Sequence, residues 1–517
     1  MRGLVRGHRD LAVTPHHLAT SAAIGVFHAG GNAVDAAIAA NAVQGTVAPE
    51  TCGIGGDLFA LVHVPGDPTP YALNASGTAG SRNTVRSVGG PEMPLFGPHS
   101  VTIPGCVAGW AALHERFGRL PFDRLLSPAR ALAEEGFFAS EEFVGAMRRR
   151  GEELSGQAIA GEVLPGGRPP APGTRIRRPS LARSLGRIAE HGAPGFYEGH
   201  VALQVSRAVG DLITTDDLAA FTPEWVRPLA RDVLGLTAWT IPPNTQGYLT
   251  LAGLRILEML GPGDDEAELL HLQVEAYRSV AWERDDLVAD PAHAPLPPEE
   301  LVSDERLAPR AAAISRDRVT PWPAEDEPQG GTAYAAFIDR DGMGISLIQS
   351  NFMGLGTTIA AGDAGFLLQN RGGSFTLADG HPNQLAPGKR PLHTLAPTLW
   401  TDGDELRAIL GTRGGHQQPQ YLMRAAWDLF ARGMSPERAQ DSARWHTTAF
   451  GPGAPSVLEL ESTAGGGVAD TLRAKGHEVE SVEPRGGFGP VSMIVVEDGL
   501  RSGASDPRVV VSGAAAT

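Results

Sequence analysis

Cysteine is nearly absent from this chain, which contains only Cys52 and Cys106, both in apolar or glycine-rich surroundings. Two isolated cysteines exclude a disulfide framework and a cysteine-based metal site, so we expect two buried thiols. The histidines His16, His17 and His381 have no acids or cysteines near them at metal-ligand spacing. The sequence therefore predicts neither a metal nor another cofactor.

Long apolar segments and clusters of positive charge are also missing. No hydrophobic run approaches the roughly 20 residues that cross a membrane, and no unbroken apolar stretch of signal-peptide length follows the basic first residues. The formal net charge is -16, and no Lys/Arg cluster is interleaved with aromatic residues. We therefore expect neither a membrane nor a nucleic acid as a partner.

What the chain contains is the balance of an ordinary globular protein, with 42% hydrophobic and 20% charged residues. Its 65 glycines and 41 prolines predict many turns and ordered loops. The 517 residues are enough for a large core, and neither an internal repeat nor a clean linker divides them. We therefore predict a single intertwined domain over residues 1–517.

The most informative stretch runs from Gly330 to Thr358. Two apolar runs, 333–338 and 345–348, flank an Asp-Gly pair and predict two strands joined by a tight turn. The preceding segment is acidic and rich in Pro and Gly, which indicates an exposed loop. Thr332 therefore lies where a loop enters a buried strand, directly after Gly331. On position alone, such a threonine simply starts a strand.

Three motifs in the first part of the chain are also distinctive. The run Gly30-Gly31-Asn32 joins two small-residue helices, predicted over residues 17–29 and 33–44, with asparagine as the N-cap of the second. The run Gly53-Ile54-Gly55-Gly56-Asp57 is a glycine-rich turn, but its spacing fits neither a dinucleotide site nor a P-loop. The pair Pro104-Gly105 opens another helix.

A later helix is predicted over residues 271–285. Its charged residues lie three or four positions apart, which indicates a solvated face with ion pairs along it. These residues are Glu275, Arg278, Glu283 and Arg284.

Together, the glycine-rich motifs and the Gly-Thr hairpin resemble those of the gamma-glutamyltranspeptidase family, from about residue 10 to residue 508. The resemblance implies an α+β protein, a four-layer αββα N-terminal-nucleophile hydrolase sandwich. In that family the chain cuts itself before a threonine. This implies cleavage between Gly331 and Thr332, into a large subunit of residues 1–331 and a small subunit of residues 332–517. Because the family pattern starts so early, we expect no leader and a cytoplasmic enzyme.

The resemblance also implies a mechanism. Thr332 is then the nucleophile, and its freed α-amino group, with a reference pKa of about 7.7–8.0, is the base. The backbone N–H groups of Gly414 and Gly415 form the oxyanion hole, although without a nucleophile this pair would be a plain helix entry. Ser350 takes the position of a hydroxyl that contacts the nucleophile and aids processing.

Two more positions lie near the acyl pocket by the same resemblance. His393 and Thr394 replace a Ser-Ser pair of the glutathione-cleaving members. His393 either orients the substrate or is a structural histidine. The extra cations Arg371 and Arg413 either bind a differently placed carboxylate or form ordinary ion pairs.

Both charged clamps of the glutathione-cleaving members are missing here. Those enzymes hold the glutamyl α-carboxylate with an arginine, and the matching stretch in this chain is Asn74-Ala75-Ser76. They hold the α-amino group with an aspartate, and the matching residue in the substrate pocket here is Ser374. Since such clamps provide much of the discrimination between substrates, glutathione is not the expected substrate.

The sequence therefore predicts an autoprocessing gamma-glutamyltransferase-like enzyme that cleaves a small acyl amide through an acyl-enzyme, with water or an amine as acceptor. Its motifs look most like those of the acylase and oxamate-amidohydrolase branch. One alternative is hydrolysis of another acyl bond, including a carbon–carbon bond, in secondary metabolism. Another is an unprocessed homologue that acts as a binding or scaffolding protein. Expected partners are the two subunits of one precursor, and a homodimer of such heterodimers is a further option.

Overall fold

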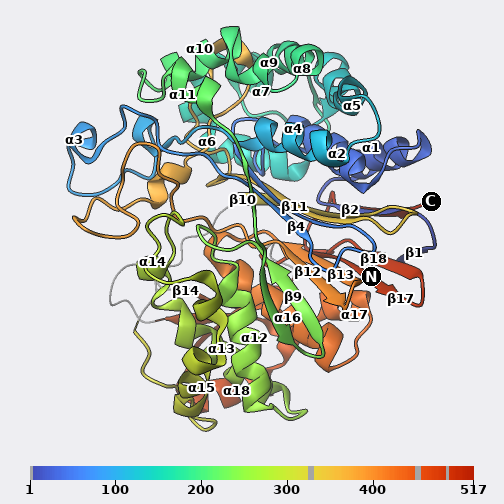
Figure 1. Ribbon diagram of the computed structural model, residues 1–517, viewed down its shortest axis with the longest axis vertical. Coiled ribbons are helices and arrows are strands. Elements are labelled where there is room, and N and C mark those ends of the chain that lie inside the picture. Colours follow the sequence, from blue (N-terminus) through green and yellow to red (C-terminus); the bar gives the residue numbers. More distant parts are fainter. Residues whose placement is uncertain (1–3, 324–330, 449–455, 485–487) are drawn as a thin grey trace.

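Two seven-stranded antiparallel sheets lie face to face in the middle of the molecule, as the computed structural model shows for residues 4–323, 331–448, 456–484 and 488–517 (Figure 1). The first sheet has the order β1 (Val5–Gly7), β18 (Leu500–Ala504), β17 (Val491–Glu497), β13 (Glu405–Thr412), β12 (Thr398–Asp402), β9 (Leu236–Thr240), β8 (Leu229–Val233). The second has the order β19 (Gly513–Ala516), β2 (Leu11–Thr14), β10 (Gly331–Ile338), β11 (Gly344–Phe352), β3 (Asp57–His63), β4 (Tyr71–Ala75), β7 (Glu224–Val226).

The alternation of side chains along the strands creates the layers. On β3, Phe59 and Leu61 belong to the core between the two sheets, whereas Leu58, Ala60 and Val62 belong to the core under the helices. Successive strand residues point to opposite faces, so a strand that is apolar throughout must be covered on both sides. Every residue of β3 is buried, which places this sheet in the interior of a sandwich.

Helices cover the outer face of each sheet (Figure 1). Over the second sheet lie α1 (His17–His28), α2 (Ala33–Val47), α4 (Cys106–Phe117), α5 (Phe122–Glu135), α6 (Glu141–Ser155), α8 (Pro179–His191) and α10 (Gly199–Ala208). Over the first lie α12 (Tyr248–Leu260), α13 (Glu266–Ala281), α15 (Asp304–Ala313), α16 (Gln418–Ala426) and α18 (Gly466–Ala474). The α+β class and the four-layer αββα sandwich predicted from the sequence are confirmed.

Several local predictions hold as well. Asn32 caps α2, and its side chain accepts from the Asp35 N–H at 2.9 Å while the Asp35 carboxylate accepts from the Asn32 N–H at 3.2 Å. The two strands predicted around the Asp-Gly turn are β10 and β11. Cys52 and Cys106 are buried free thiols.

The predicted solvated face of the helix near residue 271 is wrong. The helix α13 begins at Glu266, and all but three of its residues are buried. Glu275 is 0% exposed because α13 lies between α12, α16 and α18. None of the helices in the described part of the chain is long and apolar enough to cross a membrane.

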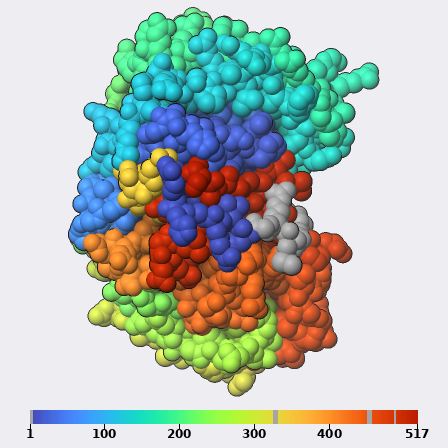
Figure 2. Space-filling model, turned by 90° about the vertical axis from the view of Figure 1, so that its right-hand side faces the viewer, coloured from blue at the N-terminus to red at the C-terminus, as the bar shows by residue number. Residues whose placement is uncertain are grey.

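Both sheets combine strands from the two sides of Gly331. Residues before it supply β1, β8 and β9 to the first sheet and β2, β3, β4 and β7 to the second, and residues after it supply the rest. The two ends of the chain also pair with each other, β1 with β18 and β2 with β19. Figure 2 shows these blue and red segments side by side across the middle of one face.

Candidate active site

Thr332 lies at the start of the central strand β10, where the strand pairing is irregular. Gly331 is the register partner of Phe352 and Ala333 that of Gln349, so the register shifts between them. Such a bulge redirects a side chain relative to the regular pleat. Thr332 is 2% exposed, so a buried hydroxyl lies at the point where the chain enters the sheet.

The Ser350 hydroxyl joins Thr332 to the peptide bond before it. It donates to the Gly331 carbonyl at 2.6 Å and accepts from the Phe352 N–H at 2.7 Å. The Thr332 Oγ1 lies 3.5 Å from the Ser350 Oγ, at the outer limit of a hydrogen bond. The structure thus brings Thr332 and Ser350 together and places a donor on the carbonyl that Thr332 would attack.

Gly331 is held where only a glycine fits. A Cβ added to it would lie 2.8 Å from the Gly354 Cα and 3.0 Å from the Glu50 carbonyl oxygen. Burial also raises the pKa of the Glu50 carboxyl to about 8. No sequence signal singles out Glu50, since its contact with residue 331 depends on long-range packing.

The Gly414-Gly415 turn follows directly after β13, which packs against β10. A Cβ on Gly411 would lie 2.0 Å from the Tyr334 ring, so the two strands approach very closely there. Gly414 and Gly415 have φ angles of +132° and +60°, which favour glycine. Neither N–H group donates a hydrogen bond to any residue in the described part of the chain, so both remain available to an oxyanion.

A narrow cavity lies beside Thr332 and the end of β13. Its lining includes Thr332, Tyr334, Gly411, Thr412 and Arg413. The Arg413 Nη1 lies 3.1 Å from a carboxylate oxygen of Glu142, so this cation borders the cavity and forms an ion pair as well.

Gln246 joins the loop of Thr394 to the Gly414-Gly415 turn, which is the candidate oxyanion turn. Its side-chain N–H groups donate to the carbonyl of Thr394 and to that of Gly415, both at 3.0 Å. Gln246 is fully buried. It was not predicted as a site residue, because a glutamine before a helix carries no recognisable motif.

Arg371 begins the short helix η5 (Arg371–Ser374) and points into the same region. Its Nη2 donates to the Thr394 hydroxyl at 3.2 Å, and its guanidinium lies 3.8 Å from the centre of the Phe352 ring. The structure thus brings Arg371 and Thr394 together. Ser374, at the other end of η5, is half-buried, and its carbonyl accepts from the Asn383 side chain at 2.6 Å.

His393 forms a buried pair with Asp57, the last residue of the glycine-rich motif. The His393 Nε2 lies 3.2 Å from an Asp57 carboxylate oxygen, and the ring packs edge-on against Phe59. Burial lowers the pKa of His393 well below its usual value, and the Arg371 cation lowers it further. Burial also raises the pKa of Asp57 to about 7. These contacts support the structural interpretation of His393, and they identify Asp57 as a polar residue of the site that was not predicted.

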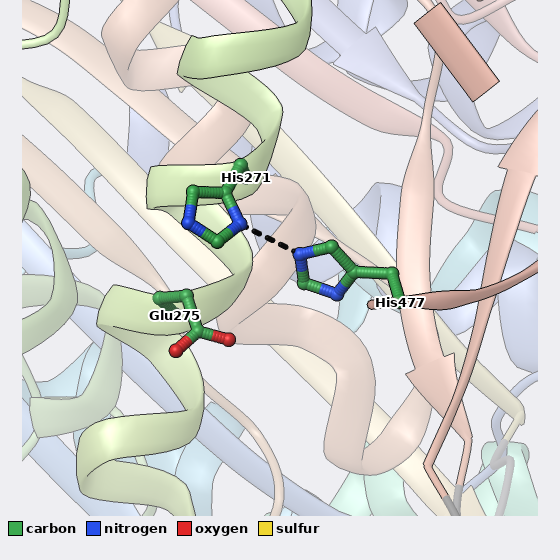
Figure 3. Close-up of side chains that lie close together, drawn as sticks. All are labelled: His271, Glu275 and His477. Atoms are coloured by element: carbon green, nitrogen blue, oxygen red, sulfur yellow. Dashed lines mark hydrogen bonds between the residues drawn. The ribbon is translucent and has the colours of Figure 1, made fainter. Parts of the chain in front are cut away.

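A second polar cluster lies on α13, where His271 and Glu275 meet His477 (Figure 3). The His271 Nε2 donates to the Ser315 carbonyl at 2.7 Å, so its Nδ1 must accept from the His477 Nε2–H at 2.8 Å. A Glu275 oxygen accepts from the Thr320 N–H at 2.8 Å. The residue types suit a divalent cation, but the two rings already satisfy each other as a neutral pair.

A four-layer αββα sandwich with a buried hydroxyl residue at the start of a central strand defines the class of the N-terminal-nucleophile hydrolases. The family model described as "Gamma-glutamyltranspeptidase" matches residues 19–516. The chain therefore belongs to the gamma-glutamyltranspeptidase family of autoprocessing enzymes, which hydrolyse or transfer acyl groups.

Individual relatives cover the whole chain. It is 36% identical to the "Glutathione hydrolase-like YwrD proenzyme" of Bacillus subtilis and 34% identical to the "Oxamate amidohydrolase proenzyme" of Klebsiella pneumoniae, with 98% of both chains covered in each case. Among solved structures, cephalosporin acylase from Bacillus halodurans superposes with a TM-score of 0.92 at 32% identity, covering 100% of this chain and 97% of that one.

Proposed function

We propose that the chain is cleaved by its own Thr332 and that the freed threonine then hydrolyses a small acyl amide. The observation that carries this proposal is the Ser350 hydroxyl, which lies between the Thr332 side chain and the Gly331 carbonyl. A donor at 2.6 Å from that carbonyl polarises it and stabilises the oxyanion that attack produces.

Processing follows from this geometry in two steps. The Thr332 Oγ1 attacks the Gly331 carbonyl carbon, its proton passes to the Thr332 nitrogen, and the peptide bond becomes an ester. Water then hydrolyses the ester, which leaves a carboxylate on Gly331 and a free α-amino group on Thr332. A single residue thereby gains both the nucleophile and a base that titrates near neutral pH.

The same hydroxyl would then act on the substrate. The α-amino group takes the Thr332 hydroxyl proton as Oγ1 attacks the acyl carbon, and the N–H groups of Gly414 and Gly415 receive the oxyanion. The proton passes to the departing amine, and water or another amine releases the acyl group from the ester. We assign Thr394, Ser374, Arg371 and Arg413 to the acyl pocket, where Arg371 donates to Thr394, and we assign a supporting role to His393, which pairs with Asp57.

The residues at the place of the missing clamp argue against glutathione as the amide that is cleaved. Asn74 and Ser76, which occupy the place of the missing arginine, are buried and hydrogen-bonded to each other at 2.7 Å. They offer a substrate carboxylate no positive charge. The oxamate amidohydrolase among the relatives is consistent with a small acyl group.

Intact-mass spectrometry of the purified protein tests the proposal, with Thr332→Ala and Thr332→Ser beside the wild type. We expect two wild-type fragments divided at Gly331–Thr332, an uncleaved Thr332→Ala chain, and slower cleavage of Thr332→Ser. A wild type that stays whole under all conditions would favour the scaffolding alternative. Cleaved protein that ignores amides but cuts an activated ketone would favour the carbon–carbon alternative.

A further inference from the structure

Arg371 is a buried cation with an incomplete set of hydrogen bonds. Its side chain is 1% exposed, and among the described residues only Nη2 has a hydrogen-bond partner, the Thr394 hydroxyl. Nε and Nη1 donate to no residue in the part of the chain that the structure describes. A guanidinium has five N–H donors, and leaving them unpaired away from water is costly. This arrangement indicates a place for a group that is not part of the chain.

The nearby acid does not accept a hydrogen bond from the guanidinium. Asp57 is the nearby acid, and its oxygens already accept from the Gly77 N–H at 3.0 Å, from His393 at 3.2 Å and from Gln369 at 3.5 Å. Burial lowers the pKa of Arg371 to about 9, which still leaves it charged at neutral pH. The guanidinium therefore lacks an oxygen ligand for Nε and Nη1 among the described residues.

The position of this cation ties it to the reaction. It stacks on Phe352, the register partner of Gly331, which directly precedes the nucleophile. Its hydrogen-bond partner Thr394 shares the Gln246 side chain with Gly415 of the oxyanion turn. These contacts link the guanidinium to the strand pair that carries Thr332 and to the loop that Gln246 joins to Gly415, so we place the acyl group of a substrate beside it.

We propose that Arg371 determines specificity by binding a carboxylate of the acyl group, one or two carbons from the scissile carbonyl. The substrates are then monoamides of short dicarboxylic acids. Two parallel N–H donors match the two oxygens of a carboxylate, which gives both affinity and orientation. This inference rests on the proposed acyl transfer by Thr332 and deepens it.

Cleavage of the chain provides the access that a carboxylate needs. Phe352 covers one face of the guanidinium and has a φ of +74°, a left-handed conformation that non-glycine residues rarely adopt. Its neighbour across the strands is Gly331, the residue at the cut. Once the bond after Gly331 is broken, this pair is released and the ring is free to turn away from Arg371.

A matched pair of substrates tests the inference on cleaved wild-type enzyme, after mass spectrometry has confirmed the cut. Oxamate carries a carboxylate next to its amide carbonyl, and oxamide replaces that carboxylate with a neutral amide of similar size. We expect kcat/KM for oxamate to exceed that for oxamide by about 100-fold, as for a charge-assisted bidentate contact. The longer monoamides malonamate and succinamate show how far the carboxylate can lie from the carbonyl.

Variants assign the effect to one side chain. Arg371→Gln is expected to lower kcat/KM for oxamate about 100-fold and leave oxamide nearly unchanged. Arg178→Gln is the matched control, because Arg178 is equally buried but both its Nη1 and its Nη2 donate to backbone carbonyls, those of Gly45, Thr46 and Gly365. The Arg178→Gln substitution should lower the stability of the protein and leave the ratio of kcat/KM for oxamate to that for oxamide at its wild-type value.

The outcomes distinguish failure of the carboxylate anchor at Arg371 from failure of the proposed acyl transfer by Thr332. Equal rates for each monoamide and its neutral diamide in the wild type would overturn the carboxylate anchor and leave acyl transfer standing, even if Arg371→Gln does not fold. A fully cleaved enzyme that hydrolyses no amide would overturn the proposed function itself. An unchanged substrate ratio in folded, cleaved Arg371→Gln would overturn the role of Arg371 alone.

Discussion

At the scale of single residues, the Ser350 hydroxyl is the group whose removal is most informative. Among the residues that the structure describes, Ser350 is the one whose side chain donates to the Gly331 carbonyl, and its hydroxyl accepts from the Phe352 N–H at the same time. Its loss therefore removes a donor from the developing oxyanion and loosens the backbone beside the scissile bond. Neither effect requires the fold to change.

We expect Ser350→Ala to slow cleavage at Gly331–Thr332 about 100-fold, the usual effect of losing one oxyanion donor. A time course of fragment appearance on a denaturing gel measures this rate. Ser346→Ala is the control, since Ser346 is also buried on β11 but bonds the Tyr334 hydroxyl at 2.8 Å. Equal cleavage rates for wild type and Ser350→Ala would exclude Ser350 from processing.

At the scale of elements, the hairpin of β10 and β11 and the helices α1 and α2 were predictable, because turn, capping and periodicity signals act between near neighbours in sequence. The pairing of Asp57 with His393 was not, since 336 positions separate the two residues. The burial of Glu275 was missed for the same reason. Its spacing to Arg278 is that of a solvated helix, and only the packing of α12, α16 and α18 shows otherwise.

The histidine pair on α13 gives a prediction for acid stability. Burial lowers the pKa of His477 to about 3 and also lowers that of His271. Below about pH 6.5 the unfolded chain binds protons that the folded chain does not. The contribution of the neutral pair to the free energy of unfolding is therefore fully present above this pH and is lost progressively as the pH falls. At pH 5, His477 alone should cost about 2 kcal/mol, seen as a lower urea midpoint than at pH 7.5.

Two comparisons check this interpretation of the cluster. His477→Asn should flatten the pH dependence of the urea midpoint, whereas His191→Asn, at a site with a 57% exposed side chain, should leave it unchanged. If added Zn²⁺ raised the Tm of the wild type and not that of His477→Asn, the cluster would be a metal site and the neutral-pair description would be wrong.

At the scale of the whole molecule, the two chain ends support the strand that carries Thr332. The strand β19 pairs with β2, and β2 pairs with β10. At the end of the chain, the Thr517 hydroxyl donates to the Asp10 carboxylate at 2.6 Å and the Thr517 N–H to the Asp10 carbonyl at 3.0 Å. Residues near the two ends of the sequence, Pro15 and Ser512, also line the cavity beside Thr332.

Deletion of residues 513–517 should therefore destabilise the second sheet by about 2 kcal/mol or more, because several strand hydrogen bonds are lost together and β2 becomes an open edge. Urea unfolding and the rate of self-cleavage measure the two consequences. Thr517→Ala, which keeps the strand and removes only the hydroxyl contact, should have a much smaller effect. A truncated chain with wild-type stability would show that β19 is dispensable.

The mixing of strands from both sides of Gly331 has a consequence for how the protein can refold after it has been unfolded. Before cleavage, the strands of both sheets are tethered, so their assembly is a first-order reaction that does not depend on concentration. After the proposed cleavage at Gly331–Thr332 the same assembly needs two separate polypeptides to meet, and neither contains a complete sheet. The cleaved protein should therefore refold poorly when it is diluted out of denaturant at low protein concentration, while the Thr332→Ala chain refolds well. The lifetime of the folded, cleaved protein would then depend on how slowly it unfolds.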